Sequence, residues 1–459
     1  MAAYDLIVLG TGPAGQKAAI SAAKLSKRVA IVERNEEVGG GCLHYGTIPS
    51  KTLREAVAYL SGIAQRDLYG ASYRVKDHIT IKDLTFRTQR VIENEANVVR
   101  DQLVRNYVDI VSGTGSFVGP GQISVSTTDG ARLLEADRVI IATGSRPGRA
   151  AGIDFDDRKV IDSDGLLKLG EIPRNITFVG AGIIGIEYAT IFRLLGVKVT
   201  LIDARPRPLE FLDDEIEDAL YYHMREEGIT LRFGETVSKV QHTDDGRVLV
   251  TLASAKTLTT DSLMFSAGRE GASQQLNLEA IGVETDPRGR IKVDETYRTN
   301  VPGVYAVGDV IGFPSLASTS MQQGRLAALY AFGATTPRVS SKLPLGIYTI
   351  PEVAMVGPTE QELTTSSVPY EIGLARFREL SRIQITGGRG GLLKLIFRRD
   401  NLKLLAVHIL GQSATELVHI GQMLIDHEGS VEYFRDAVFN YPTLAEAYKV
   451  AALDGLNRL

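Results

Sequence analysis

The feature that most constrains this chain of 459 residues is a glycine fingerprint that occurs twice. The first copy, GTGPAG at residues 10–15, follows a short apolar run, Tyr4–Leu9, and precedes an alanine-rich stretch that we expect to be helical to about Ser26. A second apolar run over residues 28–32 ends at Glu33. Strand, glycine turn, helix, strand and acidic residue follow one another in the order of a dinucleotide-binding βαβ unit.

The second copy, GAGIIG at residues 180–185, stands in the same context. A buried strand is predicted over Ile176–Val179, then a helix to about Leu195 and a second strand that ends at Asp203. In both copies the acidic residue lies 23 positions after the first glycine, from 10 to 33 and from 180 to 203. One such fingerprint is a weak signal, but two at matching spacing indicate two Rossmann-like domains.

The residue types of both turns suit the binding of a dinucleotide. The first glycine permits a tight turn, the second lets the backbone approach a pyrophosphate, and the third lets the helix pack close to the strand. The helix that follows directs its N–H groups and the positive end of its dipole at the phosphates.

The rest of the chain is organised around these two units. Residues 51–106 are charged and predicted to be mostly helical, and Val139–Pro147 reads as a strand ending in a glycine turn. The segment TNVPGVYAVGD at 299–309 is predicted to be a strand that closes on Gly308-Asp309. After about Pro337 the chain alternates strands (IYTI, LLKLIF, KLLAVHILG) and helices without a glycine fingerprint. We predict an α/β fold with two Rossmann-like dinucleotide-binding domains and a C-terminal α+β domain. The expected boundaries are 1–146 with 267–337 for the first domain, 147–266 for the second and 338–459 for the third.

Composition excludes several other classes of protein. The net charge is −4 with Lys and Arg spread along the chain, so no nucleic-acid surface is expected. No apolar run reaches the roughly 18 residues of a transmembrane helix, and the chain starts directly with a strand rather than a signal peptide. We therefore expect a cytoplasmic location and no membrane contact. Cys42 is the only cysteine and the seven histidines lack metal-ligand spacing, so neither a disulfide scaffold nor a metal site is predicted.

The paired fingerprints, the ATG turn at 142–144 and the YAVGD segment at 305–309 resemble the two-dinucleotide flavoprotein family of glutathione reductase and lipoamide dehydrogenase. The resemblance covers essentially the whole chain. It implies that the first fingerprint binds FAD, with Glu33 at the adenosine ribose and Asp309 at the ribityl chain. It also implies that the second fingerprint binds NAD(P)H and that the C-terminal domain forms a dimer.

The resemblance carries a set of binding residues onto this sequence. For FAD these are Gly10, Gly12, Pro13, Ala14, Gly15, Glu33, Arg34, Gly41, Cys42, Thr47, Lys51, Ala142, Thr143, Gly144, Gly308, Asp309 and Ala317. For NAD(P) they are Gly180, Gly182, Ile183, Ile184, Gly185, Glu187, Asp203, Arg205, Arg207 and Gly268.

The segment GGGCLHYGTIPSK at 39–51 departs from the disulfide reductases of this family, which carry two redox cysteines here. Cys42 is kept, but Thr47 stands at the second position and cannot form a disulfide. Near the C-terminus, Tyr441 stands where those reductases have a histidine, and a tyrosine with a pKa of about 10 is a poor base at pH 7. Both halves of the disulfide machinery are therefore missing.

One branch of the family fits both losses. Its members transfer a hydride between NADPH and NAD+ through FAD, with Si-face specificity, and resemble this chain in the run GGGC-x-H-x-GTIPSK and in the tail FNYPTLAEAYKVAALDGLNRL. The resemblance implies catalytic roles for Lys51 near flavin N5 and for Glu187 as its counter-charge. A helix beginning within Ser315–Arg325 is expected to direct its N-terminal dipole at flavin N1 and O2. One nicotinamide site predicts ping-pong kinetics.

The second acidic position bears on the choice of nucleotide. An acid at the strand end favours NAD by bonding the ribose 2′-hydroxyl, whereas a nearby arginine accommodates the 2′-phosphate of NADP. Asp203, Arg205 and Arg207 supply both residue types, which suits a site that accepts NADPH/NADP+ and NADH/NAD+ in turn. The alternative is that the two arginines are solvated loop charges.

Other interpretations stay open at this point. Cys42 is either a reactive thiol or, as we favour, a packing residue, and a catalytic pair with the adjacent His44 is disfavoured. Tyr441 either covers the partner subunit's flavin site or donates a hydrogen bond there, or it packs in the core or in an interface. The chain as a whole is alternatively a diaphorase or quinone reductase, or a nucleotide-sensing flavoprotein without catalysis. A disulfide reductase is disfavoured by Thr47 and Tyr441.

Overall fold

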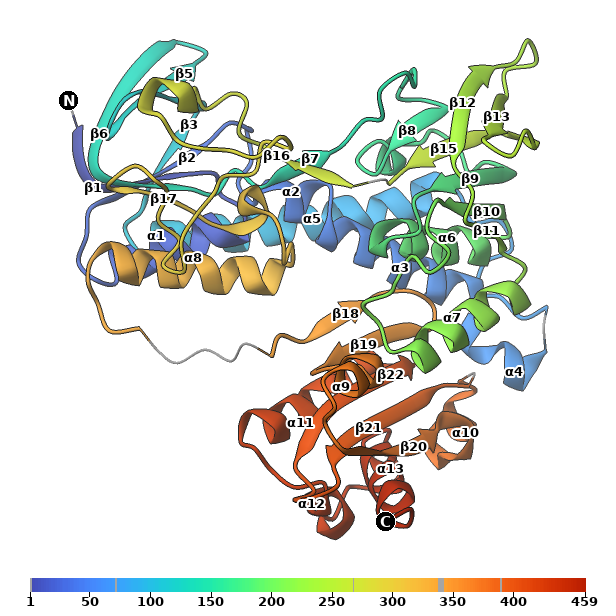
Figure 1. Ribbon diagram of the computed structural model, residues 1–459. Coiled ribbons are helices and arrows are strands. Elements are labelled where there is room, and N and C mark those ends of the chain that lie inside the picture. Colours follow the sequence, from blue (N-terminus) through green and yellow to red (C-terminus); the bar gives the residue numbers. More distant parts are fainter. Residues whose placement is uncertain (1, 71, 267, 337–341, 389) are drawn as a thin grey trace. The chain divides into compact units, whose positions relative to one another are not determined.

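The computed structural model describes residues 2–70, 72–266, 268–336, 342–388 and 390–459, and the chain divides into two compact units (Figure 1). Unit 1 comprises residues 1–52, 85–148 and 268–338. Unit 2 comprises residues 53–84, 149–267 and 339–459. The domain boundaries expected from the sequence stay a prediction, and those at 267, 337 and 338 fall outside the described residues.

Unit 1 is built on a sheet with the strand order β3-β2-β1-β6-β5-β4, in which β17 also pairs with β6. Strands β1, β2, β3, the end of β6 and β17 run parallel, whereas β4, β5 and the start of β6 are antiparallel. The side chains of Leu6, Ile7 and Val8 are all fully buried, as expected for a central strand covered on both faces. The strands are β1 (Ala2–Leu9), β2 (Val29–Glu33), β3 (Asp109–Ser112), β4 (Thr114–Gly119), β5 (Gln122–Thr127), β6 (Gly130–Ile141) and β17 (Val304–Ala306), with the separate pair β7 (Ser145–Pro147) and β16 (Arg269–Gly271).

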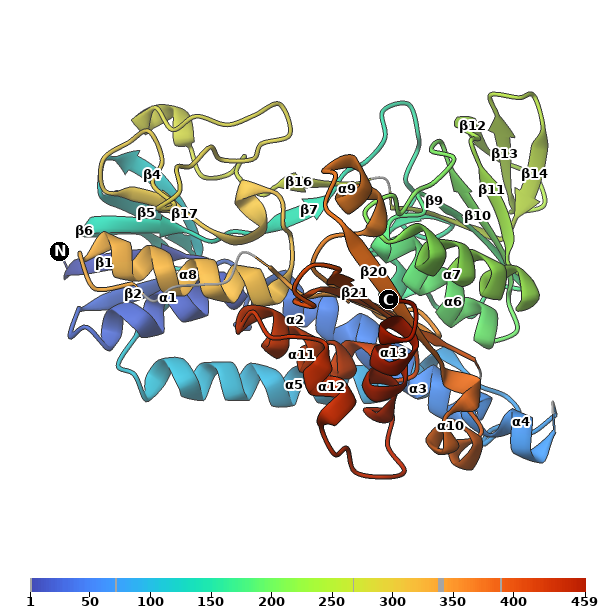
Figure 2. The ribbon, with the colours of Figure 1, turned by 60° about the horizontal axis from the view of Figure 1, so that its bottom comes forward.

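Two helices of unit 1, α1 (Pro13–Ala23) and α8 (Ala317–Ala331), lie side by side beneath the parallel strands in both views (Figures 1 and 2). They share one apolar core in which Ala18 and Ala328 are fully buried. Small residues make this close contact possible, since a Cβ on Gly324 would lie 2.0 Å from the Ala14 carbonyl oxygen. Unit 1 also contains α2 (Gly40–His44), η3 (Leu278–Ile281) and η4 (Gly308–Ile311).

The charged stretch between the two fingerprints is helical, as predicted. Its helices are α3 (Thr47–Ser61), η1 (Ile63–Gln65), α4 (Arg66–Tyr69) and α5 (Ile81–Val104). Residues 53–84 of this stretch belong to unit 2, where Leu53, Val57 and Leu84 enter its largest core.

Unit 2 contains a parallel sheet with the strand order β11-β10-β9-β15-β8. A smaller antiparallel sheet has the order β12-β13-β14. Phe178 and Leu201 are fully buried beside Ile186 of α6, which places the core between that helix and the parallel sheet. The elements are β8 (Val160–Asp162), η2 (Leu166–Lys168), β9 (Asn175–Val179), α6 (Ile183–Leu194), β10 (Lys198–Asp203), α7 (Asp214–Glu226), β11 (Thr230–Phe233), β12 (Val237–His242), β13 (Val248–Leu252), β14 (Thr257–Thr260) and β15 (Ser262–Phe265).

The C-terminal part of unit 2 is an antiparallel sheet with the order β18-β19-β22-β21-β20, against which α11 and α13 pack. The predicted strand at IYTI is wrong in its extent: strand pairing covers Leu345–Ile347, and the backbone leaves the sheet at Tyr348. The elements are β18 (Leu345–Ile347), β19 (Glu352–Val356), α9 (Glu360–Thr365), β20 (Tyr370–Arg376), η5 (Phe377–Glu379), α10 (Ser381–Thr386), β21 (Leu392–Arg398), β22 (Leu404–Gly411), α11 (Ala414–Asp426), α12 (Glu432–Asp436) and α13 (Glu446–Leu456).

The predicted fold class is confirmed: each fingerprint leads from a parallel strand into a helix, and an α+β part follows. Among the described residues, no helix is long and apolar enough to cross a membrane. The cytoplasmic location stays a prediction.

We predict that Gly185→Ala disrupts the second βαβ unit, whereas Gly182→Ala is tolerated. A Cβ on Gly185 would lie 1.9 Å from the Gly180 carbonyl oxygen, so the helix must move away from the strand. A Cβ on Gly182 would meet no atom within 4 Å. Thermal unfolding of both variants measures the difference, and we expect Gly185→Ala alone to lose several degrees or fail to fold. Equal effects would contradict the close approach of strand and helix.

Candidate functional site

The first glycine turn leaves open space in front of α1. Gly10 has a φ of +104°, and its backbone lies against residue Ala142, whose carbonyl oxygen would be 2.5 Å from an added Cβ. Gly12 caps the helix, and a Cβ on it would meet nothing within 4 Å. The hydroxyl of Thr143 beside the turn is buried and has no hydrogen-bond partner among the described residues. An open helix N-terminus beside an unsatisfied hydroxyl fits the polar backbone of a dinucleotide.

Glu33, at the end of β2, is held against this turn. Its Oε2 accepts hydrogen bonds from the backbone N–H of Thr11, at 3.2 Å, and from the Thr11 hydroxyl, while Oε1 accepts from the Asn35 N–H at 2.9 Å. The Thr11 hydroxyl oxygen in turn accepts from the Gly39 N–H at 2.9 Å. A carboxylate offers about four acceptor positions, so Glu33 retains capacity for a ribose hydroxyl.

Asp309 lies in a hydrogen-bonded chain that the sequence did not indicate. The Ser145 hydroxyl donates to Asp309 Oδ2 at 3.0 Å, and Arg269 Nε donates to the Ser145 hydroxyl oxygen at 2.8 Å. The preceding Gly308 N–H donates to the buried side-chain oxygen of Gln323 at 2.8 Å. Ser145, Arg269 and Gln323 orient the strand end that carries the predicted ribityl-binding acid.

The side chains of Cys42 and Thr47 lie close together. Cys42 lies in α2 and Thr47 opens α3, and their side chains contact each other. Burial raises the pKa of the Cys42 thiol, and the opposing effects of the neighbouring Thr47 and of the charge of Lys51 do not cancel that rise. His44 is directed elsewhere, with its Nε2 2.9 Å from the Val38 carbonyl oxygen. A protonated thiol without a histidine partner suits packing better than nucleophilic chemistry.

The second glycine turn repeats the geometry of the first in unit 2. Gly180 has a φ of +103°, and an added Cβ would lie 2.7 Å from the Ser266 carbonyl oxygen. Gly182 caps α6, and the Ala181 N–H donates to Asp203 Oδ2 at 2.7 Å. Each turn is therefore tied to the acid that ends the second strand of its own unit, Glu33 in the first copy and Asp203 in the second.

The Arg205 guanidinium lies on the Asp203 carboxylate. Nε is 3.0 Å from Oδ1 and Nη2 is 2.9 Å from Oδ2, and the Arg205 N–H donates to Oδ1 at 2.9 Å. Burial alone would raise the pKa of Asp203, but these hydrogen bonds and the one from Ala181 lower it. The carboxylate is therefore charged and fully hydrogen-bonded at neutral pH.

Arg207 faces carboxylates of α7 rather than Asp203. It forms ion pairs with Glu217 at 2.6 Å, Asp218 at 3.0 Å and Asp214 at 3.1 Å. Both arginines are about half-exposed and are paired with carboxylates of the same unit, and their role toward the nucleotide stays a prediction.

Glu187 is buried in α6, and its Oε1 accepts a hydrogen bond from the Tyr348 N–H at 2.8 Å. Lys51 belongs to unit 1 and Glu187 to unit 2, so their pairing stays a prediction. Tyr441 is 64% exposed, with its hydroxyl 2.6 Å from that of Ser381. Among the other predicted residues, Arg34, Gly41 and Gly268 are exposed, and Gly144, Ile183, Ile184 and Ala317 are half-buried.

Comparison with known proteins gives one consistent result. The family model described as pyridine nucleotide-disulphide oxidoreductase matches residues 4–324, and its dimerisation-domain model matches residues 343–452. The chain is 55% identical over 463 residues to the soluble pyridine nucleotide transhydrogenase of Mycobacterium tuberculosis (strain ATCC 25177 / H37Ra). The alignment covers 100% of this chain and 98% of the relative. It is 48% identical over 464 residues to the protein of that name from Marinomonas sp. (strain MWYL1), covering 99% of each.

A solved structure has a similar fold. The Cu(II) complex of the HOCl-induced flavoprotein disulfide reductase RclA from Escherichia coli superposes with a TM-score of 0.89 at 25% identity, over 99% of both chains.

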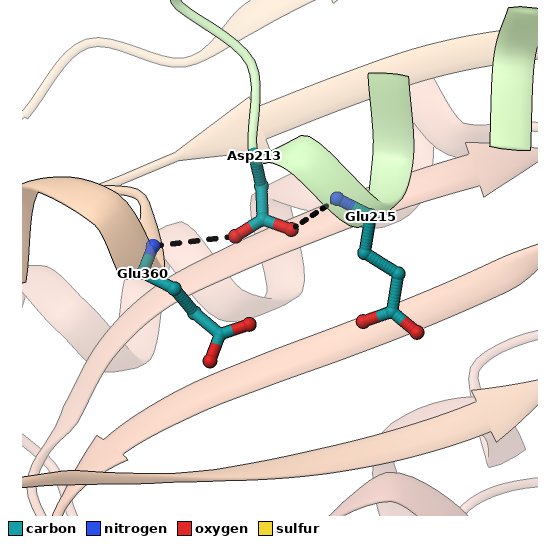
Figure 3. Close-up of side chains that lie close together, drawn as sticks. All are labelled: Asp213, Glu215 and Glu360. Carbon is teal, nitrogen blue, oxygen red and sulfur yellow. Dashed lines mark hydrogen bonds between the residues drawn. The ribbon is translucent and has the colours of Figure 1, made fainter. Parts of the chain in front are cut away.

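A cluster of carboxylates outside both glycine turns has the composition of a metal site. Asp213 caps α7, and its oxygens accept from the N–H groups of Glu215 and Glu360, both at 3.2 Å (Figure 3). Oxygens of these three carboxylates lie within 4.8 Å of one another. The Lys394 ammonium already occupies this position, 2.7 Å from Asp213 and 3.1 Å from Glu215, and it also pairs with Glu360.

The ammonium of Lys394 acts as the cation of this cluster. Its side chain is fully buried in β21. Burial alone would lower the pKa of Lys394, but the hydrogen bonds with Asp213 and Glu360 raise it, so the charge is retained. The cluster therefore joins the start of α7 to the C-terminal sheet of unit 2.

We predict that Lys394→Met lowers the free energy of unfolding by about 3–5 kcal/mol, because it leaves the buried Asp213 carboxylate without its cation. Lys403→Met is the matched control, since Lys403 pairs with Glu428 at the surface and is expected to matter by less than about 1 kcal/mol. Urea unfolding followed by circular dichroism measures both. If the free energy of unfolding of Lys394→Met falls no further than that of Lys403→Met, the buried cluster adds no stability.

Proposed function

This chain belongs to the pyridine nucleotide-disulphide oxidoreductase family, and from that premise we propose that it transfers a hydride between NADPH and NAD+ by way of FAD. The observation that carries the proposal is the pair of Cys42 and Thr47: the position of a redox disulfide holds one thiol and one hydroxyl, while both nucleotide turns are intact. The relatives at 55% and 48% identity, named soluble pyridine nucleotide transhydrogenases, support the same activity.

The residues of unit 1 suit FAD. The turn at Gly10–Gly15 would receive its pyrophosphate, Glu33 the adenosine ribose and Asp309 the ribityl chain. The unsatisfied Thr143 hydroxyl supplies one further donor beside the turn. When bound, FAD supplies a ring that accepts a hydride from one nicotinamide and returns it to another.

The proposed reaction explains why the disulfide machinery is dispensable. NADPH and NAD+ become NADP+ and NADH, so the hydride given up by one nicotinamide is gained by the other and no net proton is taken up. No disulfide is broken, and no histidine is needed to manage thiol protons. Thr47 and Tyr441 are compatible with this balance.

The nucleotide turn of unit 2 would serve both substrates. Asp203 is the acid for the 2′-hydroxyl of NAD, and Arg205 and Arg207 are the cations for the 2′-phosphate of NADP. With one turn for two nucleotides, NADP+ leaves before NAD+ enters, and the kinetics are ping-pong. Parallel lines in double-reciprocal plots are the expected result.

Further assignments extend the proposal. Lys51 is the catalytic group near flavin N5 and Glu187 is its counter-charge. The transfer is Si-specific, and α8 directs its N-terminus at flavin N1 and O2. The C-terminal part forms a homodimer, which its match to the dimerisation-domain model supports. Exposed apolar residues at Tyr433, Val438 and Tyr441 provide surface for that contact.

The direct test follows NADPH-driven reduction of thio-NAD+ by the purified flavoprotein, with lipoamide and a quinone as competing acceptors. We expect rapid transfer to thio-NAD+ and no turnover of lipoamide. Turnover of the quinone alone would replace the proposal with a diaphorase. Binding of NADPH without turnover of any acceptor would indicate a nucleotide sensor.

We further predict that anaerobic titration reduces the wild-type protein with about two electrons per FAD, because Thr47 leaves Cys42 without a redox partner. Thr47→Cys places a second sulfur beside the first, and the oxidised variant is expected to take up about four electrons, two of them by a disulfide. Thr47→Ser adds no sulfur and serves as the control. An uptake of four electrons by the wild type would reveal a second redox group and contradict this assignment.

A further inference from the structure

The two arginines after β10 are held in different ways. Arg205 lies on Asp203 with its side chain 49% exposed, and among the described residues its ion pair and side-chain hydrogen bonds go to that one carboxylate. Asp203 receives four hydrogen bonds, from Ala181 N–H and from three nitrogens of Arg205, which fills the acceptor positions of a carboxylate. A ribose 2′-hydroxyl can therefore bond Asp203 only after Arg205 has moved.

Arg207 forms an ion pair with the buried side chain of Glu217. Its Nε and Nη2 atoms are buried and make no hydrogen bond among the described residues. The contact with the fully buried Glu217 is an ion pair, with Nη2 2.6 Å from Oε2. Its Nη1 atom lies 3.0 Å from Asp218, which is 66% exposed. One edge of the guanidinium is thus fixed in the protein.

Glu217 is itself immobilised. Its Oε1 accepts from the Leu209 N–H at 3.0 Å and from the Tyr221 hydroxyl at 2.7 Å. The Tyr221 ring packs edge-on against Phe233 with the ring centroids 4.9 Å apart. Glu217 therefore fixes both the Arg207 side chain and the loop residue two positions after it.

We propose that Glu217 is a positioning residue that holds Arg207 as a fixed cation for the 2′-phosphate of NADP(H), while Arg205 is the arginine that moves. This inference rests on the proposed function and adds a residue that determines specificity. A preorganised guanidinium loses little conformational freedom when it binds a phosphate, so its placement contributes to affinity.

A role of Glu217 through its charge and a role through its position predict opposite effects of its substitution on phosphate binding. If Glu217 acted only by its negative charge, its removal would strengthen the binding of a phosphate to Arg207. If it acts by position, its removal weakens that binding, and so does shortening it without loss of charge.

The experiment uses the FAD-loaded protein and measures binding of 2′,5′-ADP and 5′-AMP by calorimetry. The variants are Glu217→Gln, which removes the charge, Glu217→Asp, which keeps it but shortens the side chain, and Asp218→Asn, which removes an exposed charge beside Arg207. Glu226→Gln removes a charge from the exposed end of the same helix and is the matched control. Thermal unfolding of every variant checks the fold.

We expect both Glu217 variants to bind 2′,5′-ADP about tenfold more weakly, the effect of one displaced charge-assisted contact, with 5′-AMP changed less than about twofold. The KM for NADPH should rise in parallel while the KM for NADH and kcat with NADH stay unchanged. Asp218→Asn should weaken 2′,5′-ADP binding far less, and Glu226→Gln should leave it unchanged.

Tighter binding of 2′,5′-ADP by Glu217→Gln and Asp218→Asn, or wild-type binding by Glu217→Asp, would overturn the positioning role. If Glu217→Gln fails to fold, Glu217→Asp decides alone. Failure of the wild-type protein to bind 2′,5′-ADP would instead refute the proposed function, so the two failures are distinguishable.

Discussion

The structure depends on one hydrogen bond that occurs in both nucleotide turns: a backbone N–H inside the glycine loop donates to the acid that ends the second strand. Thr11 donates to Glu33 at 3.2 Å and Ala181 donates to Asp203 at 2.7 Å. The bond ties the loop to the strand end, so the open helix N-terminus and the acid keep a fixed separation. Because both acids are buried, an unpaired carboxylate there would cost several kcal/mol, and the turn residues supply the needed donors.

The two copies differ in the donors that form the other hydrogen bonds to the acid. The other donors to Glu33 are the Thr11 hydroxyl of the glycine loop and the backbone N–H of Asn35, two residues after Glu33 itself, and neither is a mobile side chain. Asp203 is completed by the half-exposed Arg205 side chain, which can rotate away. A rigid first site suits a cofactor that stays bound, and an adjustable second site suits substrates that exchange. The difference between one cofactor and two alternating nucleotides can thus reside in a few side chains on otherwise equivalent βαβ units.

The sequence predicted what depends on local pattern. Apolar runs, glycine spacing and strand-end acids placed β1, α1, β9 and α6 to within a few residues, because buried parallel strands and helix starts have strong local signals. Contacts between distant side chains were not predictable: Ser145 with Asp309, and Arg207 with Glu217, depend on how elements pack. Lys394 was hidden in the apolar segment LLKLIF, since strand periodicity gives no sign of a buried ion cluster. The strand expected at IYTI fails after Ile347 because Tyr348 turns its N–H toward Glu187 instead of a neighbouring strand.

Helix α7 connects two of these unpredicted features at its first turn. Asp213 caps the helix and pairs with the buried Lys394, and its carbonyl oxygen accepts the N–H of Glu217 at 2.9 Å. Glu217, one turn along, holds Arg207. The buried cation in the C-terminal sheet therefore fixes the start of the helix from which the nucleotide loop is positioned. A cluster with the composition of a metal site serves as a structural anchor because a lysine supplies the cation, and the geometry of the loop depends on that anchor as well as on the fingerprint.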